Sequence, residues 1–523
     1  MGLQLNLLFK NVFDRSIFLL AIPLVLSAFT HIWNPIGFPA FFTDEGSYMR
    51  RAMLVLEGGG LQESHSVNPF FGQIFLAAIL SIVGYPNSFN PSADLHSIEM
   101  LYVVPRVMMG ILAVVDTFLL YKITEYRYNR KVALIASILF AVMPITWLMR
   151  RVFLDNLMMP FLLSSILFAV YLKNSKDNRR IPFILLSGVF LGLAILTKIP
   201  VVTMIPLVGF FIYTNNNKKV SRNLKALGLW FIPIILIPLT WPAYNLSVDQ
   251  FDTWLGTVLH QTQRGDRNII TNSLLILYQA DPVLVVLAAA GLVFALIRRD
   301  LLILLWAIPY VVFFFYIIGR MTFSYWIPLL PVFCIAAATL LVKLSDVISK
   351  KGIRQILPFS LLSGIIIFGL ISTTMLIATN LSSYQIEATA FVAQHIPNIK
   401  TADKIANNNN PNRIDDVTII TGPIYSWIFR YIFDVNHVFS NYRDNQPIET
   451  EKVIMMADGF YRTYVRSNEG NAKVERLQMA YDNTNGTATF KGQNLDYDYG
   501  KYPYMNMKYA IRGGTRVEIR TNY

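Results

Sequence analysis

Long apolar runs dominate the chain up to about residue 380, and no other feature of the sequence constrains the fold as strongly. A helix needs about 20 mostly apolar residues to cross the hydrocarbon core of a bilayer. Eleven segments approach this length, at 16–34, 102–121, 132–148, 157–172, 183–197, 199–213, 226–244, 279–297, 301–318, 323–342 and 355–378. Because a backbone in lipid must satisfy its own hydrogen bonds, such runs form helices. We therefore predict a polytopic α-helical membrane protein with about eleven spans.

The composition agrees with this prediction. Hydrophobic residues make up 54% of the chain and charged residues only 15%, whereas soluble domains carry roughly 25% charged residues. The net charge of +13 could indicate a nucleic-acid partner, but the Lys and Arg residues lie in short loops between apolar runs. We therefore expect membrane lipid and no nucleic acid as a partner. The single cysteine, Cys334, excludes an intrachain disulfide.

The basic loops predict the orientation of the chain, because cytoplasmic loops are rich in Lys and Arg. Basic clusters precede the first apolar run and follow the second, fourth, sixth, eighth and tenth, so eleven spans place all of them on one side. The N-terminus is then cytoplasmic in a multi-pass protein of the cell membrane. The first run could instead be a cleaved signal peptide, but its length and its aromatic end favour an uncleaved anchor.

Three segments then face outward, at 35–101, 245–278 and from 380 to the end. The last of these begins with a helical pattern, YQIEATAFVAQHI, and later contains the strand-like runs DDVTIITG and RVEIRTNY. We predict a transmembrane domain over 1–379, with a long first outer loop at 35–101. A small α/β extracytoplasmic domain follows over 380–523.

Acidic residues occur at two outward positions. Asp44 and Glu45 stand in FFTDEGSYMRRA, directly after the first span, and Asp155 stands beside Arg151 in MRRVFLDNLMMPF, in the turn between the third and fourth spans. Solvated loop carboxylates and an interfacial ion pair are the ordinary explanations. Ionisable residues near the membrane are nevertheless unfavourable unless they have a partner or a function.

Cationic residues occur on the same side. Lys198 lies in GLAILTKIP, Arg320 and Tyr325 in GRMTFSYWIPLLP, and Arg264 and Arg267 in HQTQRGDR. A snorkelling lysine and a solvated loop would explain these residues without any function. Taken together with the acidic residues, they supply carboxylates and cations to one face of the membrane.

That combination suits glycosyl transfer from a sugar phosphate. The phosphate is a good leaving group when cations stabilise the charge that develops on it. An acceptor hydroxyl needs a base, and a carboxylate can serve as one. Arginine suits phosphate because its planar guanidinium bonds two oxygens at once. Direct attack in one step would invert the anomeric configuration.

The motifs resemble the GT-C fold membrane glycosyltransferases, in particular the superfamily of protein O-mannosyltransferases and lipid A aminoarabinose transferases. The resemblance rests on motifs that keep their order between about 41 and 336. These are FFTDEGSY, NPFFGQIFLAAIL, PRVMMGIL, RRVFLDNLMMPF, GLAILTKIP and RMTFSYWIPLLP. The family's His-Pro-Pro or Lys-Pro-Pro is replaced here by Asn68-Pro69-Phe70, so a cation at this position is missing. The WWD-type motif of oligosaccharyltransferases is missing from the tail.

The resemblance implies roles for individual residues. Asp44 would be the principal catalytic carboxylate with Glu45 beside it, and Asp155 would be the second acidic position. Residues implied in substrate binding are Lys198, Arg264, Arg267, Tyr325, Arg320, Arg106 and Arg151. Arg106 resembles an arginine at the start of the second span whose structural and functional roles are hard to separate. Asp44 and Asp155 could also hold a divalent cation through oxygen ligands, although no spacing demands one, and no other cofactor is expected.

The sequence thus predicts an inverting glycosyltransferase. It would move a monosaccharide from a polyprenyl phosphate carrier, of the dolichyl type, to a protein, glycan or lipid acceptor on the outer membrane face. A transporter or flippase of lipid-linked sugars would need the same cations and is the alternative. A non-catalytic scaffold with an outer binding domain is a third hypothesis. Formation of a glycosidic bond by the purified protein separates the enzyme from the transporter, and in a scaffold the acidic pair should tolerate alanine.

Overall fold

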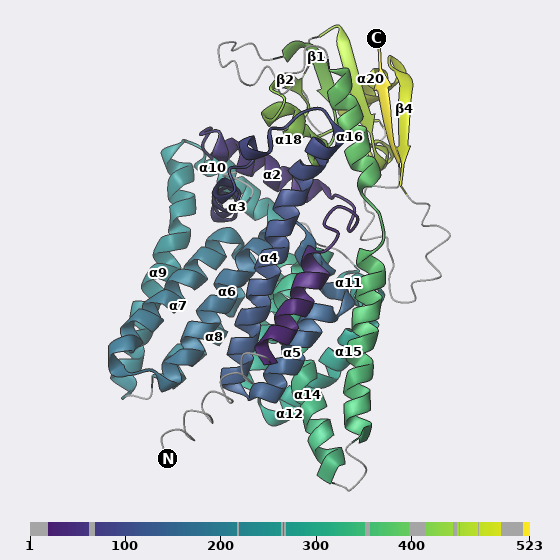
Figure 1. Ribbon diagram of the computed structural model, residues 1–523. Coiled ribbons are helices and arrows are strands. Elements are labelled where there is room, and N and C mark those ends of the chain that lie inside the picture. Colours follow the sequence, from purple (N-terminus) through teal and green to yellow (C-terminus); the bar gives the residue numbers. More distant parts are fainter. Residues whose placement is uncertain are drawn as a thin grey trace.

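A long helical bundle carries a small sheet domain at one end in the computed structural model of the chain (Figure 1). The structure describes residues 19–61, 68–216, 219–262, 265, 268–350, 356–396, 414–442, 447–448, 450–468, 470–492 and 516–523. Beside the helix Leu19–Ile32, the bundle contains α4 (Leu95–Arg127), α5 (Arg130–Val142), α6 (Leu154–Tyr171), α7 (Asp177–Thr197), α8 (Ile205–Asn215), α9 (Val220–Ser247), α12 (Pro282–Arg298), α13 (Leu301–Val312), α14 (Leu330–Lys350) and α15 (Ile356–Ile377). Shorter helices lie near the sheet domain or between these elements.

The predicted polytopic helical fold is confirmed. Eight described helices are long and apolar enough to cross a membrane, or up to ten if each of two bent helix pairs counts as one span. The shorter apolar helices Leu19–Ile32 and Ile199–Asn215 coincide with the first and sixth predicted spans. One of the eight, Phe71–Phe89, lies within the predicted first outer loop. It contains α3 (Phe71–Ile82), which packs against α2 (Thr43–Leu56) close to the sheet domain.

Two apolar segments contain a sharp bend, one inside the predicted span 132–148 and one at the start of the predicted span 279–297. Helix α5 turns by 70° into the 3-10 helix η2 (Pro144–Arg150), and α11 (Ile269–Ala280) meets α12 at an angle of 119°. Pro144 and Pro282 each stand at the first position after a break. Proline is favoured there because it lacks the backbone N–H that a continuous helix would use. The bend after α5 redirects the chain toward the start of α6.

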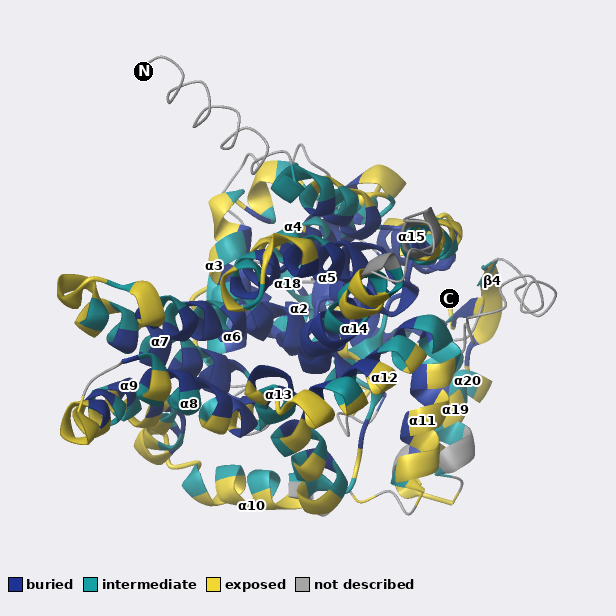
Figure 2. Ribbon diagram, turned by 90° about the horizontal axis from the view of Figure 1, so that it is seen from below, coloured by how far each residue is buried: buried dark blue, intermediate teal, exposed yellow. Residues whose placement is uncertain are grey.

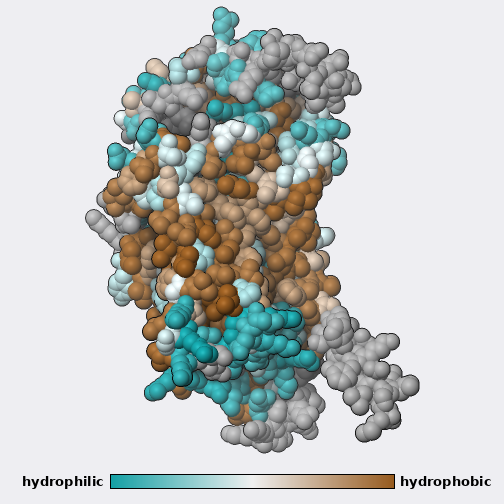
Figure 3. Space-filling model, turned by 90° about the vertical axis from the view of Figure 1, so that its left-hand side faces the viewer, coloured by the Kyte–Doolittle hydropathy of each residue, from teal (hydrophilic) through white to brown (hydrophobic). Residues whose placement is uncertain are grey.

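The surface of the bundle is apolar over its middle. Figure 3 shows a band of hydrophobic residues between hydrophilic ends, and Figure 2 shows exposed residues along the outer faces of α7 and α9. Exposed apolar residues on α9 include Ile232, Ile235, Leu236 and Leu239. Helices α6 and α14, by contrast, lie inside the bundle and are mostly buried. A wide apolar exterior is what lipid contact requires and what water would penalise.

The tail forms a mixed five-stranded sheet with the order β2-β1-β3-β5-β4. Strand β1 is parallel to β2 and β3, whereas β5 is antiparallel to β3 and β4. The strands are β1 (Ile414–Ile420), β2 (Val435–Val438), β3 (Lys452–Ala457), β4 (Asn485–Lys491) and β5 (Arg516–Thr521), and the helices are α16 (Ser383–His395), α18 (Pro423–Tyr431), α19 (Gly459–Ser467) and α20 (Ala472–Asp482). The predicted helix near 384 and the two predicted strands appear as α16, β1 and β5.

The tail and the first outer loop share one hydrophobic core, which includes residues of α2, α4, α16, α18 and the sheet. Helices α2 and α18 approach so closely that a Cβ at Gly46 would lie 2.0 Å from the Pro423 carbonyl oxygen. Tyr102 donates a hydrogen bond of 3.1 Å to the Ile424 carbonyl and packs edge-on against Trp427. This packing fixes the sheet domain above the outer-loop helices.

Candidate active site

A cavity of about 810 Å³ lies where the outer loop, the bundle and the tail meet. Six parts of the chain contribute its polar lining. These residues are Asp44 and Tyr48 of α2, Asp155 of α6 with Lys198 after α7, Arg320, Thr322, Ser324 and Tyr325 before α14, and Thr463 of α19. Asn68 also lines it. The cavity therefore collects carboxylates, cations and hydroxyls that are far apart in sequence.

Asp155 and Lys198 form an ion pair on the bundle side of the cavity. Asp155 stands in the first turn of α6, and Lys198 ends α7 in an extended conformation before Pro200. Asp155 is 2% exposed, so its charge requires this partner. The ammonium nitrogen of Lys198 also lies 4.8 Å from the centre of the Tyr325 ring. The pair thus holds Lys198 at the cavity wall and beside Tyr325.

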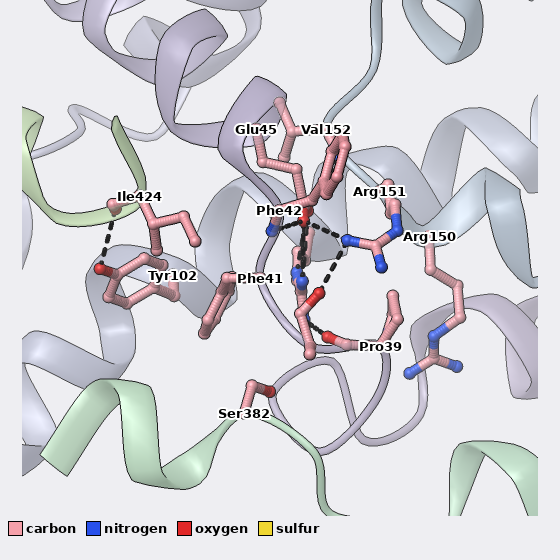
Figure 4. A network of polar contacts seen from close by, with 12 residues as sticks. Pro39, Phe41, Phe42, Glu45, Tyr102, Arg150, Arg151, Val152, Ser382 and Ile424 are labelled. Carbon is pink, nitrogen blue, oxygen red and sulfur yellow. Dashed lines mark hydrogen bonds and ion pairs between the residues drawn. The ribbon is translucent and has the colours of Figure 1, made fainter. Parts of the chain in front are cut away.

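Glu45 lies away from this cavity, although it follows Asp44 in sequence. Its carboxylate forms an ion pair with Arg106 at 3.1 Å. A second ion pair joins it to Arg151 at 2.7 Å (Figure 4). It also accepts hydrogen bonds from the backbone N–H groups of Phe42 and Val152. Successive helix residues point about 100° apart, so one residue of the pair faces the cavity and the next faces the protein interior.

The pKa of Glu45 reflects this environment. Burial raises the pKa of the carboxyl, but the guanidinium groups of Arg106 and Arg151 outweigh burial and hold the pKa below its ordinary value. Glu45 is therefore ionised at neutral pH and is a poor proton acceptor. Its geometry fits a residue that holds the site together.

Three arginines hold the segment that leads into α2. Arg106 donates to the carbonyls of Pro35 and Pro39, and Arg151 donates to that of Ala40. Arg150 donates to four further carbonyls, those of Thr30, Trp33, Asn34 and Phe38. Arg106 and Arg151, which the resemblance implied in substrate binding, thus lie outside the cavity lining. They position the loop that carries Asp44.

An aromatic layer separates the cavity from this arginine network. The rings of Phe42, Phe153 and Phe323 contact one another at centroid distances of 5.4 to 6.0 Å and all line the cavity. The guanidinium of Arg151 lies 5.5 Å from the Phe42 ring and 5.9 Å from the Phe153 ring. Apolar rings beside ionised groups lower the local dielectric and strengthen electrostatic interactions in the cavity.

Several lining residues were not predicted. Tyr48 could have been found, because it lies one helical turn after Asp44 on the same face. Phe460 and Thr463 of α19 also line the cavity, and no sequence pattern relates them to Asp44. The predicted residues Arg264 and Arg267 lie outside the described residues.

The described residues offer little for a metal ion. No group of three or more His, Cys, Asp or Glu side chains that could hold one occurs among them. Asp44 and Asp155 line the same cavity, but the ammonium of Lys198 already neutralises Asp155. A divalent cation would have to displace that ammonium, so we derive no step through a metal.

Comparison with known proteins agrees with this architecture. The family model described as dolichyl-phosphate-mannose-protein mannosyltransferase matches residues 100–241, which run from α4 to α9. None of the curated proteins matches the chain in sequence.

Solved structures share the fold over nearly the whole chain. The oligosaccharyltransferase of Archaeoglobus fulgidus, in complex with Zn and sulfate, aligns with a TM-score of 0.52 and 14% identity over 90% of this chain and 71% of that one. ArnT from Cupriavidus metallidurans, bound to undecaprenyl phosphate, aligns with a TM-score of 0.52 and 12% identity over 98% of both chains. The resemblance that the motifs indicated is confirmed by this fold and by the family match.

Proposed function

We propose that this chain, a membrane glycosyltransferase of the GT-C fold, transfers a monosaccharide from a polyprenyl phosphate carrier to an acceptor hydroxyl on the outer face of the cell membrane. The observation that carries the proposal is the single cavity that contains Asp44, the Asp155–Lys198 pair and Arg320. It offers a carboxylate for the acceptor and cations for a phosphate. Both are needed for transfer from a sugar phosphate without an added general acid.

The donor phosphate is proposed to bind Lys198 and Arg320, with the hydroxyls of Thr322, Ser324 and Tyr325 as further hydrogen-bond donors. All five line the cavity. Asp155 would act as a positioning residue, because its ion pair fixes the ammonium of Lys198. The cations would stabilise the charge that the phosphate gains as its bond to the sugar breaks.

In the proposed reaction the acceptor oxygen forms a bond to the anomeric carbon while the bond from that carbon to the phosphate oxygen breaks. The electron pair of the broken bond leaves with the polyprenyl phosphate, and Asp44 takes the proton of the acceptor hydroxyl. The attack is direct, so the product has the inverted anomeric configuration. Glycosyl phosphate and hydroxyl are the only reactants.

A lipid carrier fits the surroundings of Arg320. The π-helix η5 (Phe313–Ile318) ends two residues before it and exposes Tyr316 and Ile317. An apolar tail could lie against such residues while its phosphate enters the cavity. Two similar solved structures support the same donor class, since ArnT was solved with undecaprenyl phosphate and the archaeal oligosaccharyltransferase AglB with a dolichol-phosphate.

The distribution of basic residues supports the location of the cavity on the outer face of the membrane. The cavity adjoins the sheet domain, whereas the C-terminal ends of α12 and α14 lie at the opposite end of the bundle (Figure 1). Arg298 is the last residue of α12, Arg299 follows it, and Lys343 ends the apolar part of α14. The positive-inside rule assigns that basic end to the cytoplasm. The cavity and the tail would then be extracytoplasmic.

The test separates an enzyme from a transporter. Purified protein is incubated with radiolabelled polyprenyl phosphate sugars and an extract of the cell envelope as acceptor. We expect the sugar to become acceptor-linked with inverted configuration, measured by NMR, together with an equal amount of free polyprenyl phosphate. With intact spheroplasts, a membrane-impermeant acceptor should be glycosylated. Movement of the intact lipid-linked sugar without release of polyprenyl phosphate would favour the transporter.

The tail is proposed to contact the acceptor, because Phe460 and Thr463 form a cavity wall that does not belong to the membrane part. Asp458 caps α19 by accepting the Tyr461 N–H at 2.9 Å, which holds this wall in place. We expect Phe460→Ala to raise the KM for the acceptor about tenfold, equivalent to about 1.4 kcal/mol, with the donor KM unchanged.

The matched control for this substitution is Phe490→Ala on β4, whose ring packs on Phe391 in the same domain, away from the cavity. It should change neither KM. An unchanged acceptor KM in Phe460→Ala, or an equal effect of both substitutions, would argue against acceptor binding by α19.

A further inference from the structure

A second polar cavity, of about 520 Å³, lies at the end of the bundle opposite the candidate active site. The α4–α5 turn, the α12–α13 turn and α14 form it. Its cationic residues are Arg127, Arg298, Arg299 and Lys343, its acidic residues are Asp300 and Asp346, and its apolar residues are Val132, Phe294, Ala295, Ile303 and Val342. The glycosyl transfer proposed above uses none of them.

One of the two carboxylates in this cavity is already engaged. Asp300 caps α13 by accepting the Leu302 N–H, accepts a hydrogen bond of 2.8 Å from the Tyr128 hydroxyl, and lies 3.7 Å from a guanidinium nitrogen of Arg127. It therefore links the α4–α5 turn to the start of α13. These partners compensate its negative charge, so Asp300 contributes little to neutralising the other cations.

The other cations have no such compensation. Arg298, Arg299 and Lys343 make no ion pair with another residue in the part of the chain that the structure describes. Only Asp346 remains to balance the three of them at the cavity. Cations from the end of α12 and from the middle of α14 that converge on one cavity create a positive potential that attracts an anion, and arginine favours phosphate in particular.

The cavity also borders the lipid-facing surface. Leu296 and Ile297, directly before Arg298, are 61% and 75% exposed, and Leu344 and Val347 of α14 are also exposed. Apolar side chains exposed at the end of membrane helices contact acyl chains. An anion that carries acyl chains can therefore reach the cationic residues from the bilayer. A soluble anion would not need this apolar border.

We infer that this cavity binds the phosphate headgroup of an anionic membrane phospholipid. The phosphate contacts Arg298, Arg299 and Lys343, and the acyl chains lie along Ile297 and Leu344. Basic pockets between helices on the cytoplasmic side of membrane proteins recognise such headgroups. Bound lipid links α12 to α14 and stabilises the folded state, because the ligand binds the native arrangement only.

The experiment uses the full chain, delipidated in a neutral detergent, and follows its thermal unfolding. Phosphatidylglycerol should raise the midpoint by about 5 °C, and phosphatidylcholine should not. The triple substitution R298Q/R299Q/K343Q should abolish the shift. The matched control K173Q/K176Q/R179Q removes three exposed cations from the segment between α6 and α7 and from the first turn of α7, outside the cavity, and should retain the shift.

Two results would overturn the inference. Equal loss of the shift in both triple variants would mean that diffuse positive charge attracts the lipid. An equal shift with inorganic phosphate or glycerol phosphate would mean that the cavity binds free phosphate and not a lipid. If the triple variant does not fold, K343Q alone should weaken phosphatidylglycerol binding about tenfold, measured by native mass spectrometry, and unchanged binding would count against the site.

Discussion

Replacing Asp44 by asparagine should lower kcat at least about 100-fold, the smallest effect expected when a positioned general base is lost. Asparagine keeps the size of the side chain but cannot take the proton of the acceptor hydroxyl. Asp44 lines the cavity together with Lys198 and Arg320, so the substitution acts where the sugar is proposed to react. The donor KM should change little, because the phosphate-binding residues stay in place.

The measurement is initial-rate kinetics of sugar transfer with both substrates varied. Asp252→Asn is the matched control, because Asp252 is an exposed carboxylate on α10 (Phe251–Thr262) and does not line the cavity. It should leave kcat unchanged. Turnover of Asp44→Asn close to that of the unsubstituted protein would remove Asp44 from the role of base, even if the protein is shown to be a transferase.

Replacing the next residue, Glu45, by glutamine should strongly lower the stability of the folded protein. Glutamine carries no charge, so the buried guanidinium groups of Arg106 and Arg151 would lose their common anionic partner. Removing one member of a buried ion pair costs about 3–5 kcal/mol of folding free energy. Since these arginines also hold the segment from Pro35 to Ala40, the outer loop should loosen first.

Thermal unfolding in detergent at a fixed scan rate measures this effect. Glu475→Gln on α20 is the control, because Glu475 is exposed in the tail and its loss should leave the midpoint unchanged. Asp44→Asn should also leave it nearly unchanged. The two neighbouring carboxylates would then have different roles: loss of Asp44 would lower turnover, and loss of Glu45 would lower stability. Equal midpoints for Glu45→Gln and the unsubstituted protein would show that the arginines are neutralised in another way.

The pH dependence of stability provides a further readout of the same substitution. The pKa of Glu45 is lower in the folded protein than in the unfolded chain, despite burial, because of Arg106 and Arg151. The stability that this group contributes is therefore fully present above its unfolded pKa. It is lost as the pH falls through the folded pKa. The Glu45→Gln variant should lose less stability on acidification than the unsubstituted protein.

The sequence by itself determined the helical membrane part and predicted the side on which chemistry could occur. Helices of membrane length are the only spanning elements that a chain with these apolar runs can form, and the basic loops indicate the orientation. Asp155, Lys198, Arg320 and Tyr325 all lie at span ends on the same predicted side. Topology alone therefore brings them to one end of the bundle, and Asp44 follows the first span on that side.

Only the tertiary structure decided which of these residues face the cavity and which face the protein interior. Whether Asp44 or Glu45 faces the cavity depends on the rotation of α2, which packing against α18 and the buried arginines sets. The contribution of Phe460 to the cavity depends on the same packing. The contacts between α2 and α18 join residues more than 300 positions apart, and the ion pairs of Glu45 join residues 61 and 106 positions apart. Local periodicity carries no information about either set. Their physical basis is the close fit of two surfaces, which exists only after the tail has folded onto the outer loop.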